Sequence, residues 1–126
     1  MTTLLIIDDR ESVLHALAQR LSRVNGIDII GSAGTSQDGI NLVRATHPEV
    51  VLLELKMADG QGIDALRIIR AETPPARVIV LTSYLDDFEQ QVALKLGAER
   101  YLLKTIDSEG LAEVILGHNT APQPRP

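Results

Sequence analysis

Short, continuous apolar runs alternate along this chain with longer segments in which apolar residues recur at helical spacing. The apolar runs occupy residues 4–7, 27–32, 50–53, 77–81 and 100–103. Runs without polar alternation are typical of strands that are covered on both faces, as in a parallel sheet. Five successive β–α units therefore predict the α/β class, with right-handed crossovers and a doubly wound five-stranded parallel sheet.

The intervening segments predict five helices, at residues 12–24, 36–45, 61–71, 86–96 and 108–116. In the first of them the apolar residues fall on one face of a helix. Thr35 or Ser36 is expected to cap the second helix, and Pro48 limits how far that helix can extend. Gly97 and Gly117 follow the fourth and fifth helices, in positions where helices commonly end.

Residues 1–117 are predicted to form one domain, because a chain of 126 residues is close to the commonest domain size. The segment 118–126 differs in composition, since three of the chain's six prolines lie among its last five residues. We interpret this segment as an extended linker. It predicts that the chain was cut from a longer protein with a further domain, and a natural short tail is the alternative.

Composition excludes several classes of function. The net charge of −5 has the wrong sign for neutralising the phosphates of nucleic acid, so DNA could be contacted only through another domain. The absence of cysteine excludes thiolate metal sites and cysteine nucleophiles. The apolar runs are too short for a membrane span or a signal peptide, and we therefore expect a cytoplasmic protein without a membrane partner.

Polar side chains follow four of the five predicted strands. Asp8 and Asp9 come after the first strand, Glu54 after the third, Thr82 after the fourth and Lys104 after the fifth. In open α/β sheets, ligands bind beyond the carboxyl ends of the strands. Carboxylate oxygens suit Mg²⁺, while a lysine and a hydroxyl can bind a phosphate group. The pattern therefore predicts one pocket that holds a metal and a phosphoryl group.

Each of these residues also has an ordinary structural explanation. Asp8 and Asp9 would favour the N-terminus of the following helix, Thr82 suits a strand, and Lys104 could be a solvated lysine. Glu54 is harder to explain in this way, because a carboxylate beside a buried run needs a partner or water. All of these explanations would have to hold together at corresponding strand ends, so a shared pocket is the favoured interpretation.

Four segments resemble those of a receiver domain of a two-component response regulator, over residues 2 to about 117. "LLIIDDRESV" resembles the acidic pair of that family, and "VVLLELKMADGQGIDAL" resembles its phosphoacceptor segment. "VIVLTSY" resembles the segment of the switch threonine, and "GAERYLLKTIDSEGLAEVI" the Tyr-x-x-Lys segment with the last helix. The amino-acid sequences of these last two segments are most similar to those of regulators with a LuxR-type helix-turn-helix output domain.

The resemblance implies a flavodoxin-like sheet of strand order 2-1-3-4-5 and a role for each polar residue. A weak Mg²⁺ site would be formed by Asp8, Asp9, Glu54 and the backbone carbonyl of Lys56. The phosphoryl-binding and switch residues would be Thr82, Tyr101 and Lys104. The domain would be a signalling module rather than an enzyme. Its partners would be a sensor histidine kinase or other regulatory protein, a second copy of itself, and DNA through an output domain beyond the linker.

Glu54 departs from the family, which has an aspartate at this position as the acceptor of the phosphoryl group. Glutamate is longer by one methylene, about 1.5 Å, and a misplacement of about 1 Å can cost on the order of 10²-fold in rate. The extra reach also moves the carboxylate toward the place of a phosphoryl oxygen. Glu54 would then imitate a phosphorylated aspartate, incompletely because it has less charge and fewer acceptors. The chain would be either a natural pseudo-receiver or an engineered mimic of the active state.

Two other functions stay open from the sequence. A protein-interaction module independent of phosphorylation would use a helix face, and Ala112 and Leu116 could lie off the core-facing side of the last helix. A flavodoxin-like ligand-binding protein would need a phosphate-binding loop after the first strand. The segment "DDRESV" at that place has no glycine and presents two carboxylates, which disfavours this alternative.

Overall fold

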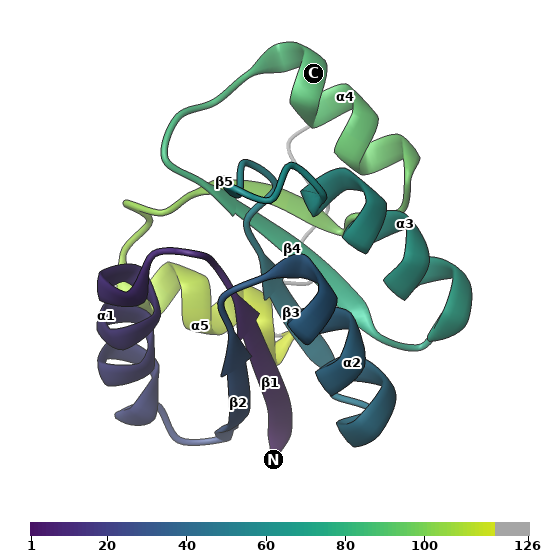
Figure 1. The fold of residues 1–126 in the computed structure, drawn as a ribbon. Coiled ribbons are helices and arrows are strands. Elements are labelled where there is room, and N and C mark those ends of the chain that lie inside the picture. Colours follow the sequence, from purple (N-terminus) through teal and green to yellow (C-terminus); the bar gives the residue numbers. More distant parts are fainter. Residues whose placement is uncertain (118–126) are drawn as a thin grey trace.

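Five strands and five helices alternate in the computed structural model, which describes residues 1–117 (Figure 1). The elements are β1 (Thr2–Ile7), α1 (Glu11–Ser22), β2 (Ile27–Ala33), α2 (Ser36–Thr46), β3 (Val50–Leu53), α3 (Gly62–Glu72), β4 (Arg77–Thr82), α4 (Asp87–Lys95), β5 (Arg100–Leu103) and α5 (Ser108–Leu116). The predicted linker 118–126 lies outside the described residues. Within residues 1–117, no helix combines the length and the apolar character that crossing a membrane requires.

The strands form one sheet of order β2-β1-β3-β4-β5, and all four neighbouring pairs are parallel. The predicted fold and strand order are therefore confirmed. The backbone pairing continues past the strand ends, where the amides of Asp8, Glu54 and Lys104 donate to the carbonyls of Ala33, Ile7 and Thr82. These hydrogen bonds fix the three polar residues at the carboxyl edge of the sheet.

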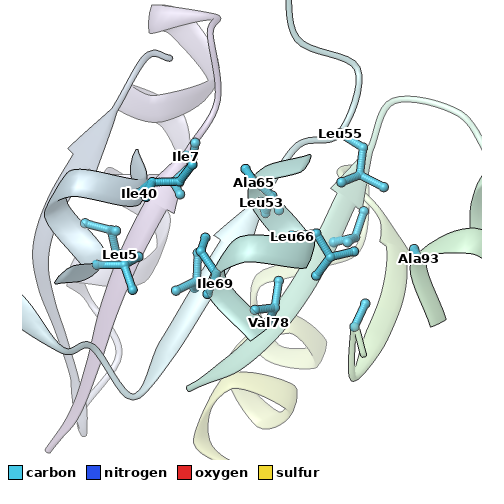
Figure 2. Packing of buried hydrophobic residues seen from close by; sticks show 14 of the residues in the cluster. Leu5, Ile7, Ile40, Leu53, Leu55, Ala65, Leu66, Ile69, Val78 and Ala93 are labelled. Atoms are coloured by element: carbon cyan, nitrogen blue, oxygen red, sulfur yellow. The ribbon is translucent and has the colours of Figure 1, made fainter. Parts of the chain in front are cut away.

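Each face of the sheet carries its own apolar layer, which explains the continuous apolar runs. In β1, Leu5 and Ile7 face α2, α3 and α4, whereas Leu4 and Ile6 face α1 and α5. Figure 2 shows the first layer, in which Leu5 and Ile7 lie near Ile40 of α2. Burying one such Leu or Ile side chain contributes roughly 1.5–3 kcal/mol relative to leaving it exposed.

The apolar residues of α5 belong to the core. Ala112 is buried, and Leu116 packs against the layer that also contains α1. The idea that these two residues present an interaction face is therefore wrong. Large exposed apolar side chains occur instead at α4, where Phe88 is 76% and Leu94 is 44% exposed.

The first residues of α2 and α4 are set by capping side chains rather than by the spacing of apolar residues. The Thr35 hydroxyl accepts a hydrogen bond from the Asp38 amide, which begins α2 as predicted. Asp86 caps α4 instead of starting it, because its carboxylate accepts from the Glu89 amide. Helix α1 ends at Ser22, earlier than predicted, although Val24 still packs against the core.

Candidate functional site

Three of the predicted residues meet at the carboxyl edge of the sheet. The Nζ atom of Lys104 lies 2.6 Å from Asp8 Oδ2 and 2.7 Å from Glu54 Oε1. Only 3% of the Asp8 side chain, 5% of the Glu54 side chain and 13% of the Lys104 side chain are exposed. The ends of β1, β3 and β5 thus converge, and one ammonium group neutralises part of the charge of two buried carboxylates.

Backbone amides satisfy the remaining oxygens of the two carboxylates. The amide of Lys56 donates to Glu54 Oε2 at 2.8 Å, and the amide of Arg10 donates to Asp8 Oδ1 at 2.9 Å. Glu54 can therefore end a buried strand, because each of its oxygens has a charged or polar donor. Burial lowers the pKa of Lys104, but the hydrogen bonds from its ammonium to Asp8 and Glu54 outweigh this effect, so the pKa is raised.

Arg20 holds the segment that follows Lys104. Its Nε donates to the Ser108 hydroxyl at 2.9 Å, and its Nη2 donates to the Ile106 carbonyl at 2.6 Å. Arg20 belongs to α1, and it lies 88 residues before Ser108 and 86 residues before Ile106 in the sequence. These hydrogen bonds attach the loop between β5 and α5, which begins at Lys104, to α1.

Asp59 anchors the loop that follows Glu54. Its Oδ2 accepts from the Ser36 amide at 2.7 Å, and its Oδ1 accepts from the Ser36 hydroxyl and the Gln61 amide. Partial burial raises the pKa of Asp59, but the hydrogen bonds from Ser36 and Gln61 more than compensate, so the pKa is lowered. The loop is thereby attached to the N-terminus of α2, outside the pocket.

Asp9 contributes to the pocket from its rim. Its side chain is exposed, and Oδ2 accepts from the Ala58 amide at 2.6 Å. A cavity of about 230 Å³ is lined by Asp9, Glu54, Lys56 and Lys104, together with Ser83 of the loop after β4. The pocket is therefore small and mainly charged.

The predicted metal ligands lie at the same edge of the sheet, but they do not surround a common position that a metal ion could occupy. Among residues 1–117, no group of three His, Cys, Asp or Glu side chains is arranged to hold a metal ion. The ammonium of Lys104 stands between Asp8 and Glu54, and Asp9 is bonded to the Ala58 amide. The carboxylate oxygens suit Mg²⁺ chemically, but an entering cation would have to compete with Lys104.

The predicted switch residues lie behind the pocket. Thr82 is completely buried, and its hydroxyl donates to the Tyr84 carbonyl at 2.9 Å, not to Glu54. Tyr101 is 7% exposed, and its hydroxyl donates to Glu89 Oε1 at 2.7 Å. Their roles in binding a phosphoryl group stay predictions.

Two side chains next to this site, those of Lys56 and Glu89, could not be predicted from the sequence. Lys56 Nζ lies 2.7 Å from Glu89 Oε1 and 4.5 Å from the centre of the Tyr84 ring. Burial lowers the pKa of Lys56, but the bond to Glu89 overrides this and the pKa is raised. The spacing of Asp86 and Glu89 indicates a helix cap, which is a local signal. No pattern in the sequence connects Glu89 with a residue 33 positions earlier.

The environment of Tyr101 predicts a specific alkaline sensitivity. Burial, followed by the hydrogen bond to Glu89, raises the pKa of Tyr101 from 10.0 to about 12. The folded state favours the neutral phenol, so this stabilisation is complete below pH 10.0 and is lost as the pH rises toward about 12. Two pKa units correspond to about 3 kcal/mol in total.

We expect Tyr101→Phe to make the free energy of unfolding less dependent on pH above about 10. Urea unfolding at about pH 9.5 and pH 11.5 should give a decline that is roughly 2 kcal/mol smaller than that of the parent. Tyr84→Phe is the control, because Tyr84 is 60% exposed. An equal decline in the parent and in Tyr101→Phe would contradict the prediction.

Comparison with known proteins identifies a family and several relatives. The response regulator receiver domain family matches residues 4–116. The chain is 36% identical to the transcriptional regulatory protein LiaR of Bacillus subtilis over 115 residues, which are 91% of the chain and 54% of LiaR. It is 33% identical to the response regulator protein VraR of Staphylococcus saprophyticus over 111 residues, 88% of the chain and 53% of VraR. The chain thus spans about half the length of the curated relatives it matches.

Two solved structures carry the same fold at somewhat lower identity. A DNA-binding response regulator of the LuxR family from Staphylococcus aureus superposes with a TM-score of 0.84 at 25% identity, covering 91% of this chain and 96% of that one. A response regulator from Burkholderia pseudomallei, with a phosphorylated aspartic acid, a calcium ion and citrate, gives 0.81 at 26% identity. That alignment covers 91% of this chain and 66% of the other.

Proposed function

The chain belongs to the response regulator receiver domain family, and from this premise we propose that it regulates transcription without accepting a phosphoryl group. Glu54 stands at the phosphoacceptor position of the receiver. The observation that carries the proposal is the bonding of its carboxylate, which accepts from both the Lys104 ammonium and the Lys56 amide. The Lys104 ammonium and the Lys56 amide thus donate to Glu54 in the absence of a phosphoryl group.

The imitation of a phosphorylated aspartate by Glu54 is incomplete. Thr82, which was expected to bind the phosphoryl group together with Lys104, donates to the Tyr84 carbonyl instead of to Glu54. Glutamate offers two oxygens and one charge, whereas a phosphoryl group offers three oxygens and more charge. We propose that the domain holds an intermediate state, in which the lysine is engaged and the threonine is not.

The longer protein is proposed to bind DNA through a helix-turn-helix domain that follows this one. Two observations support a separate DNA-binding domain: the chain is acidic, and it covers only about half of LiaR and VraR. We propose a sensor histidine kinase or another regulatory protein as the partner, a homodimer as the assembly, and the cytoplasm as the location. The domain itself would act as a signalling module and not as an enzyme.

A second candidate function is a protein-interaction module that works independently of phosphorylation. One observation favours it, namely the exposed apolar side chains of Phe88 and Leu94 on α4. They line a hollow of about 610 Å³ together with Lys95. A partner that binds equally well to Glu54 and to a Glu54→Gln variant would support this second function over the first.

The transcriptional role is tested with the complete gene in its own cells. The protein is cross-linked to DNA, and the recovered DNA is sequenced. We expect discrete enriched sites with Glu54 and weaker enrichment with Glu54→Gln, because the neutral amide loses the charge that pairs with Lys104. A lack of enriched sites with both proteins would contradict the role.

We propose that the pocket binds Mg²⁺ weakly. Receiver domains bind Mg²⁺ at the phosphorylation site, and a calcium ion accompanies the phosphorylated aspartic acid of the Burkholderia relative. Asp8, Asp9 and Glu54 would supply carboxylate oxygens, with the Lys56 carbonyl as a further ligand. The affinity is expected to be low because Lys104 already bonds to two of the three carboxylates.

We expect millimolar Mg²⁺ to shift the amide resonances of residues near Asp9 and Lys56 in a magnetic resonance titration. Asp9→Ala should abolish the response, whereas Asp64→Ala, on the surface of α3, should leave it unchanged. No shift in the parent, or the same shift after Asp9→Ala, would argue against this metal site.

A further inference from the structure

A chain of polar contacts runs from Glu54 to helix α4 by way of one residue, Lys56. The backbone amide of Lys56 donates to Glu54 Oε2 at 2.8 Å, and its side-chain Nζ lies 2.7 Å from Glu89 Oε1. Glu89 belongs to the first turn of α4. Lys56 therefore contacts the pocket through its main chain and α4 through its side chain.

The same oxygen of Glu89 also accepts a hydrogen bond from the Tyr101 hydroxyl. The Tyr101 hydroxyl donates to Glu89 Oε1 at 2.7 Å, and it lies 3.3 Å from the Asp86 amide, from which it accepts. The Asp86 carboxylate in turn caps α4 at the Glu89 amide. The hydroxyl thus bonds both to the N-cap of α4 and to a side chain of its first turn.

The contact between Tyr101 and Glu89 is largely removed from water and is therefore costly to break, whereas the Lys56 side chain is 30% exposed. The Glu89 side chain is 14% exposed and Tyr101 is 7% exposed. If Tyr101 turned outward, the Asp86 amide and the Glu89 carboxylate would each lose a partner. If Lys56 lost its charge, Glu89 would be left beside a phenol without a cation.

We propose that Lys56 and Glu89 hold Tyr101 in its buried position and couple the state of the Glu54 carboxylate to helix α4. The inference rests on the proposed function, since it takes Glu54 to be the residue whose state is read. Lys56 and Glu89 are positioning residues, because they act on the Tyr101 hydroxyl and not on a phosphoryl group. The helix they hold is the one that exposes Phe88 and Leu94.

Through these contacts, a movement of the Glu54 carboxylate would be transmitted to Tyr101 and α4. A change that draws the Glu54 carboxylate away from the Lys56 amide would move the main chain of Lys56. The Lys56 ammonium would then pull on Glu89 or release it, and Glu89 would release the Tyr101 hydroxyl. The outward position of Tyr101 and a displaced first turn of α4 are the expected result.

The two tyrosines of the chain make this testable by fluorine magnetic resonance after incorporation of 3-fluorotyrosine. Tyr84→Phe assigns the signals. Lys56→Met and Glu89→Gln should each shift the Tyr101 signal and increase its response to replacing H₂O by D₂O, because Tyr101 becomes more exposed. The double variant should have the same effect as the single variants. Lys95→Met, an exposed change on the same helix, is the control and should leave Tyr101 unchanged.

Coupling to the pocket is tested by adding Glu54→Gln. It should shift the Tyr101 signal in the parent background but not in the Lys56→Met background. Unchanged Tyr101 signals in both Lys56→Met and Glu89→Gln would overturn the inference, and so would a response to Glu54→Gln that persists without the Lys56 side chain. Either result leaves the capture of DNA by the complete protein unaffected, so it is distinguishable from a failure of the proposed function.

Discussion

Acetyl phosphate with Mg²⁺ is expected to leave the parent protein unlabelled and to add a phosphoryl group to Glu54→Asp. Both oxygens of Glu54 are bonded, one to the Lys104 ammonium and the other to the Lys56 amide. Glutamate reaches about 1.5 Å farther than aspartate. Because phosphoryl transfer depends on in-line approach, we expect the rate for Glu54 to be lower by on the order of 10²-fold or more.

Intact-protein mass spectrometry measures the added phosphoryl mass, and fragmentation locates it. Glu54→Gln is the matched control, because it keeps the side-chain length and removes the nucleophile. A labelled parent with the label on Glu54 would refute the geometric argument. An unlabelled Glu54→Asp variant would mean that the pocket is altered elsewhere, which favours a natural pseudo-receiver over an engineered mimic.

Lys104→Met should lower the free energy of unfolding by about 3–5 kcal/mol, because it leaves two buried carboxylates without their cation. Asp8 and Glu54 both bond to the Lys104 ammonium, and their side chains are 3% and 5% exposed. The pKa of Lys104 is raised from 10.5 by these bonds after the opposing effect of burial. Its stabilising contribution is therefore complete below pH 10.5 and is lost as the pH rises above that value.

Urea unfolding at neutral pH checks the prediction, with Lys95→Met as a surface control whose effect should stay within about 0.5 kcal/mol. The same variant should bind Mg²⁺ more tightly, since no ammonium competes for Asp8 and Glu54. Millimolar Mg²⁺ should therefore restore part of its stability while changing the parent little. A Lys104→Met protein as stable as the parent without metal would show that the ion contacts contribute nothing net.

The parts of the fold and site that depend on backbone periodicity could be predicted from the sequence. The continuous run at residues 50–53 predicted a strand covered on both faces, and β3 is buried throughout. The carboxyl ends of parallel strands lie at one edge, so Asp8, Glu54 and Lys104 were expected together and are in contact. Such predictions succeed because the main chain, rather than any side-chain rotamer, decides them.

The side-chain pairing within the site could not be predicted in the same way. Nothing in the sequence indicates that Lys104 would bridge two carboxylates or that Lys56 would select Glu89. Thr82 was expected to face the pocket, but its hydroxyl bonds to the Tyr84 carbonyl. These choices depend on rotamers and on distances between residues far apart in the chain. The absence of a preformed metal arrangement within residues 1–117 has the same origin.

The anchoring of the loop by Asp59 has an evolutionary consequence. Asp59 fastens the segment after Glu54 to Ser36 of α2, and it does so without help from the acceptor position. A substitution at residue 54 would therefore leave the bonds between Asp59 and Ser36 in place. The anchor of this loop and the acceptor position can therefore change independently of each other during evolution.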